Sequence, residues 1–148
     1  MIFRARKLPH TDNIALERFP KLRELNLSRS TILSAPATSH PNISAMEITS
    51  LSLAGSCYLV SPLDPAFLPV VRSLAVCLTR GASLARISPL LPQLTSLTIL
   101  SVHPDPIARC VTLSTSLKIL SLSLHTIEKL DLDSRAKIQA NIEVLCII

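Results

Sequence analysis

The chain has 148 residues, of which 48% are hydrophobic, 17% are charged and only 3% are aromatic. This length fits about one domain, and this balance of side chains excludes a globally disordered chain. The formal net charge is +5, and two glycines are too few for the glycine-rich loops that cradle phosphates.

The basic side chains gather near the start of the chain, where residues 1–29 hold seven basic and three acidic side chains. Such a segment suits an RNA, an acidic protein or lipid headgroups, or is simply a solvated arm. We expect residues 1–18 to form a basic N-terminal arm or a partial cap. The segment "FRARK" (3–7) lacks interleaved aromatic side chains that would stack on bases, so nucleic acid is not the expected partner.

Six segments follow one template of an apolar residue, two variable residues, Leu, one variable residue and a final apolar residue. They are residues 22–27, 48–53, 71–76, 94–99, 117–122 and 142–147. The central leucines Leu51, Leu74, Leu97 and Leu120 stand 23 residues apart, a period typical of solenoids of strand-containing repeats. The template therefore predicts six short parallel strands whose inward leucines stack in one column.

The segments between the templates predict short outer helices and irregular coils. Asp-Pro pairs, a Ser-Pro stop and apolar periodicity predict helices over residues 64–68, 81–91, 105–111 and 133–142. Residues 33–45 are expected to be irregular. Residues 126–132 also fit the strand template but lie too close to Leu120 for another coil, so we expect them to descend from the fifth repeat.

Three stretches that contain a template, residues 19–32, 91–102 and 115–127, resemble leucine-rich repeats. The proline before the Leu-x-x-Leu-x-Leu core is similar to that in the repeats of fungal F-box-type proteins. The resemblance implies an α/β fold, a leucine-rich-repeat solenoid of about six repeats over residues 19–148. It implies a short parallel sheet on the concave side and short helices or irregular coils outside. It also implies a non-catalytic protein-protein interaction module, for which a role as the substrate-recognition part of an F-box-like ubiquitin-ligase adaptor is one candidate.

The chain departs from this family at two places. Too few residues precede Phe19 for an F-box, so we expect the F-box itself to be absent. The family tends to place Asn three residues after the template, and other side chains stand there, which predicts a weakened ladder of side-chain bonds to the backbone. These positions hold Ser30, Ser56, Thr79, Val102 and His125.

Side chains that flank the inward leucines are expected to form a partner-binding concave face. The candidate residues are Glu24, Asn26, Ser50, Ser52, Arg72, Ser73, Ser96, Thr98, Lys118 and Ser121. Two interpretations remain open for this small, hydroxylated surface. It is either a groove for an extended peptide or another protein, or a set of small side chains that tolerate crowding on a curved sheet.

No motif indicates catalysis, a cofactor or a metal. The four histidines are scattered, no C-x-x-C pair occurs, and no G-x-S-x-G elbow is present. We therefore expect no enzyme activity, and four free thiols in a reducing compartment, the cytoplasm or the nucleus. No apolar run is long enough to span a bilayer, so we expect no membrane association.

Two further expectations concern partners. The alternative function is a basic solenoid that binds RNA or an acidic partner through residues 1–29. The last strand, "EVLCII", has no polar cap after it, and an uncovered edge strand invites pairing with another chain. We therefore expect a fragment, a diverged gene product, or an edge-to-edge homodimer through this C-terminal strand.

Overall fold

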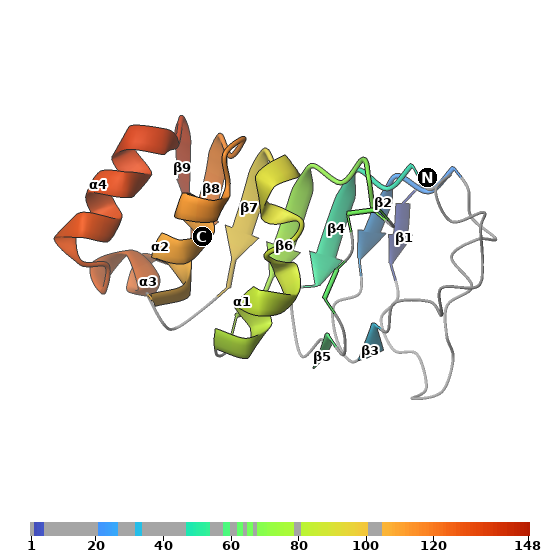
Figure 1. Ribbon diagram of the computed structural model, residues 1–148, viewed down its shortest axis with the longest axis horizontal. Coiled ribbons are helices and arrows are strands. Elements are labelled where there is room, and N and C mark those ends of the chain that lie inside the picture. Colours follow the sequence, from blue (N-terminus) through green and yellow to red (C-terminus); the bar gives the residue numbers. More distant parts are fainter. Residues whose placement is uncertain are drawn as a thin grey trace.

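The computed structural model describes residues 2–4, 21–26, 32–33, 47–53, 58–59, 62–63, 65–66, 68–78, 81–100 and 105–148. Within these ranges the chain has an α/β fold, in which a seven-stranded parallel sheet carries helices along one side (Figure 1). In spatial order its strands are β1 (Ile2–Arg4), β2 (Glu24–Asn26), β4 (Ser50–Leu53), β6 (Ser73–Val76), β7 (Ser96–Ile99), β8 (Ile119–Leu122) and β9 (Val144–Ile147). A second, two-stranded parallel sheet pairs β3 (Ile32–Leu33) with β5 (Tyr58–Leu59).

The strand register places the central leucine of each template beside the central leucine of the next. The pairs are Leu25–Leu51, Leu51–Leu74, Leu74–Leu97, Leu97–Leu120 and Leu120–Leu145. Side chains of a strand alternate between its two faces, and β4, β6 and β7 alternate between half-buried and buried residues as this rule requires. The predicted column of Leu51, Leu74, Leu97 and Leu120 is therefore confirmed, as are the six predicted strands.

The first apolar residue of each template lies just before its strand, where the chain bends out of the preceding coil. Five of these six residues are at most 4% exposed: Leu22, Ile48, Val71, Leu94 and Leu117. The sixth, Ile142, is partly buried against the same core. The coils that carry β4, β6, β7 and β8 therefore each contribute three apolar side chains to the interior, where the neighbouring coils cover them.

Three of the four predicted helices are present. Helix α1 (Gly81–Ile87) ends just before Ser88-Pro89, as predicted, and is followed by the 3-10 helix η3 (Leu91–Gln93). Helix α2 (Asp105–Leu113) begins at the predicted residue and extends two residues further, while α4 (Leu132–Asn141) covers the predicted 133–142 segment. Asp105-Pro106 marks the start of α2 and Ser88-Pro89 the end of α1 through backbone geometry, whereas α4 was predicted from the spacing of Ile138 and Ile142.

The helix predicted over residues 64–68 is wrong. Among the described residues of this segment, the chain forms turns at Pro65–Ala66 and again at Pro69–Val70. Pro69 follows Pro65 after only four residues, and the residue before a proline is pushed out of the helical region. The described residues of this segment therefore form turns where a helix was predicted.

After β8, which is the strand of the fifth template, residues 126–132 continue as a helix and a turn. Helix α3 (Leu124–Glu128) starts at Ser123, whose side chain accepts a hydrogen bond from the N–H of Thr126 at 3.3 Å. Leu130 is buried and belongs to the core. The spacing of Ile127 and Leu130 fits both a strand template and the inner face of a short helix, and the Ser123 cap favours the helix.

Strand β1 extends the sheet beyond the first template. Ile2–Arg4 pairs in parallel with β2, and Phe3 stands opposite Leu25, in the position that the central leucines occupy elsewhere. This strand lies within the segment expected to be an arm or partial cap. The irregular stretch predicted over 33–45 lies outside the described residues apart from Leu33, and so do four of the five ladder positions. The fifth, His125, is exposed on α3.

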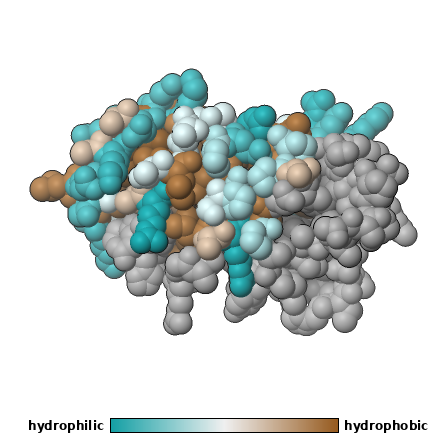
Figure 2. Space-filling view, in the orientation of Figure 1, coloured by the Kyte–Doolittle hydropathy of each residue, from teal (hydrophilic) through white to brown (hydrophobic). Residues whose placement is uncertain are grey.

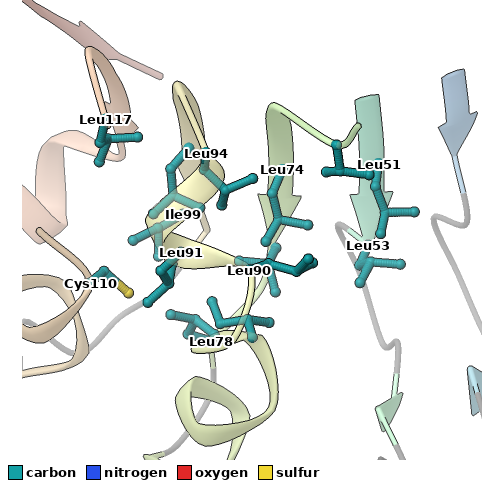
Figure 3. Close-up of a cluster of buried hydrophobic side chains, with 14 of the residues drawn as sticks. Leu51, Leu53, Leu74, Leu78, Leu90, Leu91, Leu94, Ile99, Cys110 and Leu117 are labelled. Carbon is teal, nitrogen blue, oxygen red and sulfur yellow. The ribbon is translucent and has the colours of Figure 1, made fainter. Parts of the chain in front are cut away.

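The core fills the space between the sheet and the outer elements. Figure 3 shows Leu51, Leu74 and Ile99 of the strands in one cluster of buried side chains with Leu90, which precedes η3, and Leu91, which begins it. Each of these five side chains is at most 1% exposed. Burying a Leu or Ile in this way contributes about 1.5–3 kcal/mol to folding, so the column and its cover fix the face of each strand that remains open.

Candidate binding face of the sheet

The sheet side chains that alternate with the buried leucines form what we call the open face. The register arranges them in two rows. One row contains Glu24, Ser50, Ser73, Ser96, Ile119 and Val144. The other contains Asn26, Ser52, Ala75, Thr98, Ser121 and Cys146. Each row crosses six strands that lie about 4.8 Å apart.

Hydroxyl groups cover the middle of the open face. Six of them come from half-buried residues that form no side-chain hydrogen bond within the described part of the chain: Ser50, Ser52, Ser73, Ser96, Thr98 and Ser121. Each hydroxyl can donate one hydrogen bond and accept two. The open face therefore presents hydrogen-bonding groups that no described side chain or backbone group uses.

A third row, which we call the rim, lies one residue before the strands and contains Arg23, Thr49, Arg72, Thr95, Lys118 and Glu143. Backbone hydrogen bonds join its members. The N–H of Arg72, for example, donates to the carbonyl oxygen of Thr49 at 2.9 Å, and the N–H of Thr95 donates to that of Arg72 at 2.8 Å. The hydroxyl of Thr95 also donates to the Arg72 carbonyl at 3.3 Å. The rim therefore carries cations on alternate strands, about 10 Å apart.

The three cations of the rim differ in their partners. Arg23 lies 3.8 Å from the carboxylate of Glu47, and Lys118 forms a 2.9 Å ion pair with Glu143. Arg72 is exposed, and within the described ranges it has no carboxylate partner. Its Nη1 donates instead to the carbonyl oxygens of Pro69 and Val71, at 3.1 and 3.0 Å. These bonds hold the guanidinium at the rim, where no carboxylate of the described residues pairs with its charge.

The end of the open face at β8 and β9 is apolar. Ile119 is 39% exposed and Val144 is 47% exposed, in the row where the preceding strands carry serines. Leu100, which follows β7, is 37% exposed. This row of the face therefore changes from hydroxylated over β4 to β7 to apolar over β8 and β9, while the other row keeps a hydroxyl at Ser121 of β8.

The structure brings the predicted site residues together. Eight of them lie in the two rows of the open face, and Arg72 and Lys118 lie on the rim next to them. Sequence reasoning missed the other rim residues, Arg23, Thr49, Thr95 and Glu143. Aligning the residue two before each central leucine would have found them, since basic residues and threonine alternate there over the first five strands.

No described feature of this face resembles a catalytic or metal centre. Within the described ranges, no three His, Cys, Asp or Glu side chains gather as metal ligands would. Cys77 and Cys146 are half-buried free thiols, and burial raises the pKa of the Cys110 thiol to about 12. A thiol with so high a pKa has almost no reactive thiolate at neutral pH.

The helix-bearing side of the molecule has a different surface. Figure 2 shows hydrophilic side chains over α4 and hydrophobic atoms that reach the surface between them and at the α4 end of the molecule. None of the helices that the structure describes has both the length and the apolar character needed to cross a bilayer.

The basic segment that carries the alternative function, residues 1–29, lies mostly outside the described residues. Within it, Lys21 and Arg23 are described and both are exposed. Comparison of the chain with family models, with curated proteins and with solved structures finds no match in any of the three.

Proposed function

We propose that this chain is a leucine-rich-repeat solenoid whose open face binds another protein. One apolar template recurs in six strands that share one register, with 23–26 residues from each central leucine to the next. Coils of similar length that cover one another in sequence are the physical basis of such solenoids. The rows of the open face would then lie on the concave side, where repeat proteins of this type bind their partners.

The observation that carries this proposal is the set of unused polar groups around Arg72. Six hydroxyls that form no side-chain hydrogen bond within the described residues lie on neighbouring strands, together with one guanidinium that has no described carboxylate partner. A carboxylate on the partner would pair with Arg72, and partner backbone groups would bond to Ser73 and Ser96 beside it. The small serines let a partner's backbone approach closely, so the hydrogen bonds need no long side chains.

The apolar end of the face adds a second anchor. An apolar side chain of the partner would lie against Ile119 and Val144, two to three strands away from Arg72. At about 4.8 Å per strand this separation corresponds to roughly three or four residues of an extended chain. A crowding argument alone accounts for the serines but not for the exposed Ile119, Val144 and Arg72, which favours binding over simple tolerance.

We propose a non-catalytic role because the open face offers no nucleophile with an adjacent base among its described side chains. The resemblance of the repeats to those of F-box-type proteins extends the proposal: the bound protein would be a substrate that an F-box-like adaptor delivers to a ubiquitin ligase. This extension rests on the resemblance alone.

The test compares two double variants of equal charge. Ser73→Arg with Ser96→Arg places two bulky cations on paired positions of the open face, and Gln139→Arg with Ala140→Arg places them on exposed residues of α4. A partner captured by the unchanged chain, once purified, should lose affinity by about 10-fold or more for the first variant and keep it for the second. Thermal unfolding of both variants checks that they fold.

Equal affinity of the partner for both variants would overturn the proposal. Arg72→Glu gives an independent check, because it reverses, without adding bulk, the rim charge that has no carboxylate partner among the described residues. A partner that uses this cation should bind this variant more weakly, and the loss should shrink at high salt, which screens exposed charges.

A further inference from the structure

Strand β9 carries the repeat pattern but not its burial. Leu120 and Leu122 of β8 are fully buried, whereas the equivalent Leu145 and Ile147 of β9 are 45% and 61% exposed. Val144 and Ile148 are exposed as well. Figure 1 shows β9 at one end of the sheet, with β8 as its neighbour. The core column therefore reaches an edge that the described chain leaves open.

The backbone of β9 is also open on this side. The N–H groups of Val144 and Ile148 both donate to β8, to the carbonyl oxygens of Lys118 and Leu122 at 3.0 Å. Successive residues of a strand direct their backbone groups to opposite sides, so Leu145 and Ile147 direct theirs away from β8. In the described residues no strand lies there. An added strand would bond to these two residues.

We propose that a second copy of this chain adds to this edge, with its β9 antiparallel to β9 across a two-fold axis at Cys146. The sequence of 144–148, Val-Leu-Cys-Ile-Ile, is self-complementary about its centre. Val144 would face Ile148 of the partner subunit, and Leu145 would face Ile147 of the partner subunit. We call this contact between the two β9 strands the seam. Every pair of side chains across the seam is then apolar or sulfur-containing.

Another register is less favourable. Moving the partner strand by two residues sets Leu145 opposite its own copy and brings Glu143 opposite Ile147 of the partner subunit. That arrangement would take the carboxylate away from Lys118, its 2.9 Å partner, and place it beside an aliphatic side chain. The self-complementary pattern therefore selects both the second copy as occupant and its register.

Cys146 would mark the centre of the seam. Its backbone groups bond to β8, so in the new ladder it forms a non-hydrogen-bonded pair with Cys146 of the partner subunit, with Cα atoms about 4.5 Å apart. This separation lies within the range of about 4.4–6.8 Å that disulfides span. Diamide would join the two thiols: it accepts one electron and one proton from each, becomes a hydrazine, and leaves one S–S bond.

The two-fold axis would run perpendicular to the sheet, so the open faces of both subunits would lie on the same side of one continuous sheet. A single strand edge buries less than the roughly 800 Å² per partner of a standard interface. We therefore expect a dimer with a dissociation constant in the micromolar range, which corresponds to a standard free energy of binding of about −8 kcal/mol.

Light scattering during size exclusion, in reducing buffer from about 1 to about 200 µM, should show the mass rising from one chain to two. Ile147→Lys places a charge in the seam and should keep the chain monomeric. Leu132→Lys makes the same change on α4, where the side chain is 84% exposed, and should leave the dimer intact. A monomer throughout for the unchanged chain would overturn the proposal, and so would equal association of the two variants.

Trapping with diamide tests the register without depending on a destabilising variant. The unchanged chain and Cys77→Ser should both give a disulfide-linked dimer on a non-reducing gel, and Cys146→Ser should give none. A dimer that forms equally without Cys146, or one that Cys146 cannot trap, would overturn the proposed pairing.

Discussion

Gln93 donates through its side-chain Nε2 to the carbonyl oxygen of Leu68, 2.8 Å away in the preceding coil, and also lies 3.3 Å from the carbonyl oxygen of Val71. Both carbonyl groups belong to buried residues at the entry to β6. One amide of this coil therefore bonds to two backbone carbonyl groups of the preceding coil.

Replacing this donor should weaken the contact between the two coils. Gln93→Glu puts a carboxylate, which cannot donate, beside two carbonyl oxygens, and should lower the free energy of unfolding by about 1–3 kcal/mol. Gln139→Glu makes the same change on an exposed residue of α4 and should stay within about 0.5 kcal/mol. Urea denaturation measures both, and equal losses would contradict the role of Gln93.

The two faces of β7 should respond differently to truncation. Leu97 is fully buried in the middle of the leucine column, whereas Ser96 beside it lies half-buried on the open face. Leu97→Ala should lower the free energy of unfolding by about 2–5 kcal/mol, because it leaves a cavity between coils. Ser96→Ala should change it by no more than about 0.5 kcal/mol. Similar effects of the two changes would mean that the face assignment of β7 is wrong.

The leucine column could be predicted from sequence because it depends on spacing alone. Equal spacing of Leu51 to Leu120, with a side-chain period of two in strands, fixes both register and face. Helix α4 could be predicted because Ile138 and Ile142 stand four residues apart on one side, and Ile138 is indeed buried. Both signals are local in the sequence, and no long-range contact overrides the structure that they favour.

Other features required the folded chain. β1 was missed because Phe3 replaces the leucine of the template, and α3 was missed because its apolar spacing also fits a strand. The rim was missed because Arg72 and Thr95 are neighbours only once the coils stack. The hydrogen bonds of Gln93 reach residues that stand 22 and 25 positions earlier in the chain, and no local sequence pattern predicts them.

The thiols should differ in reactivity in a way that reports on folding. Burial raises the pKa of Cys110 to about 12, and its side chain lies within the core shown in Figure 3. At about pH 8, iodoacetamide should label the half-buried Cys77 well before Cys110 in the folded chain, and both at similar rates in urea. Mass spectrometry of the peptides measures this, and early labelling of Cys110 without denaturant would contradict its burial.

The cap of α4 should make stability depend on pH in the acid range. Hydrogen bonds from Ser134, from its hydroxyl and then from its backbone N–H, hold the pKa of Asp131 below 3.8. The backbone bond measures 2.8 Å. Because the unfolded chain takes up the proton first, the stabilisation is fully present above pH 3.8 and is lost as the pH falls through the lowered pKa.

Asp131→Asn separates this effect from the cap itself, because asparagine still accepts the N–H of Ser134 at every pH. Between about pH 5 and pH 3, the free energy of unfolding from urea denaturation should fall more for the unchanged chain than for Asp131→Asn. Glu128→Gln serves as the control, since its exposed side chain forms no bond within the described residues and its curve should follow that of the unchanged chain. Parallel curves for the unchanged chain and Asp131→Asn would show that the carboxylate is not bonded as described, and that α4 begins without a charged cap.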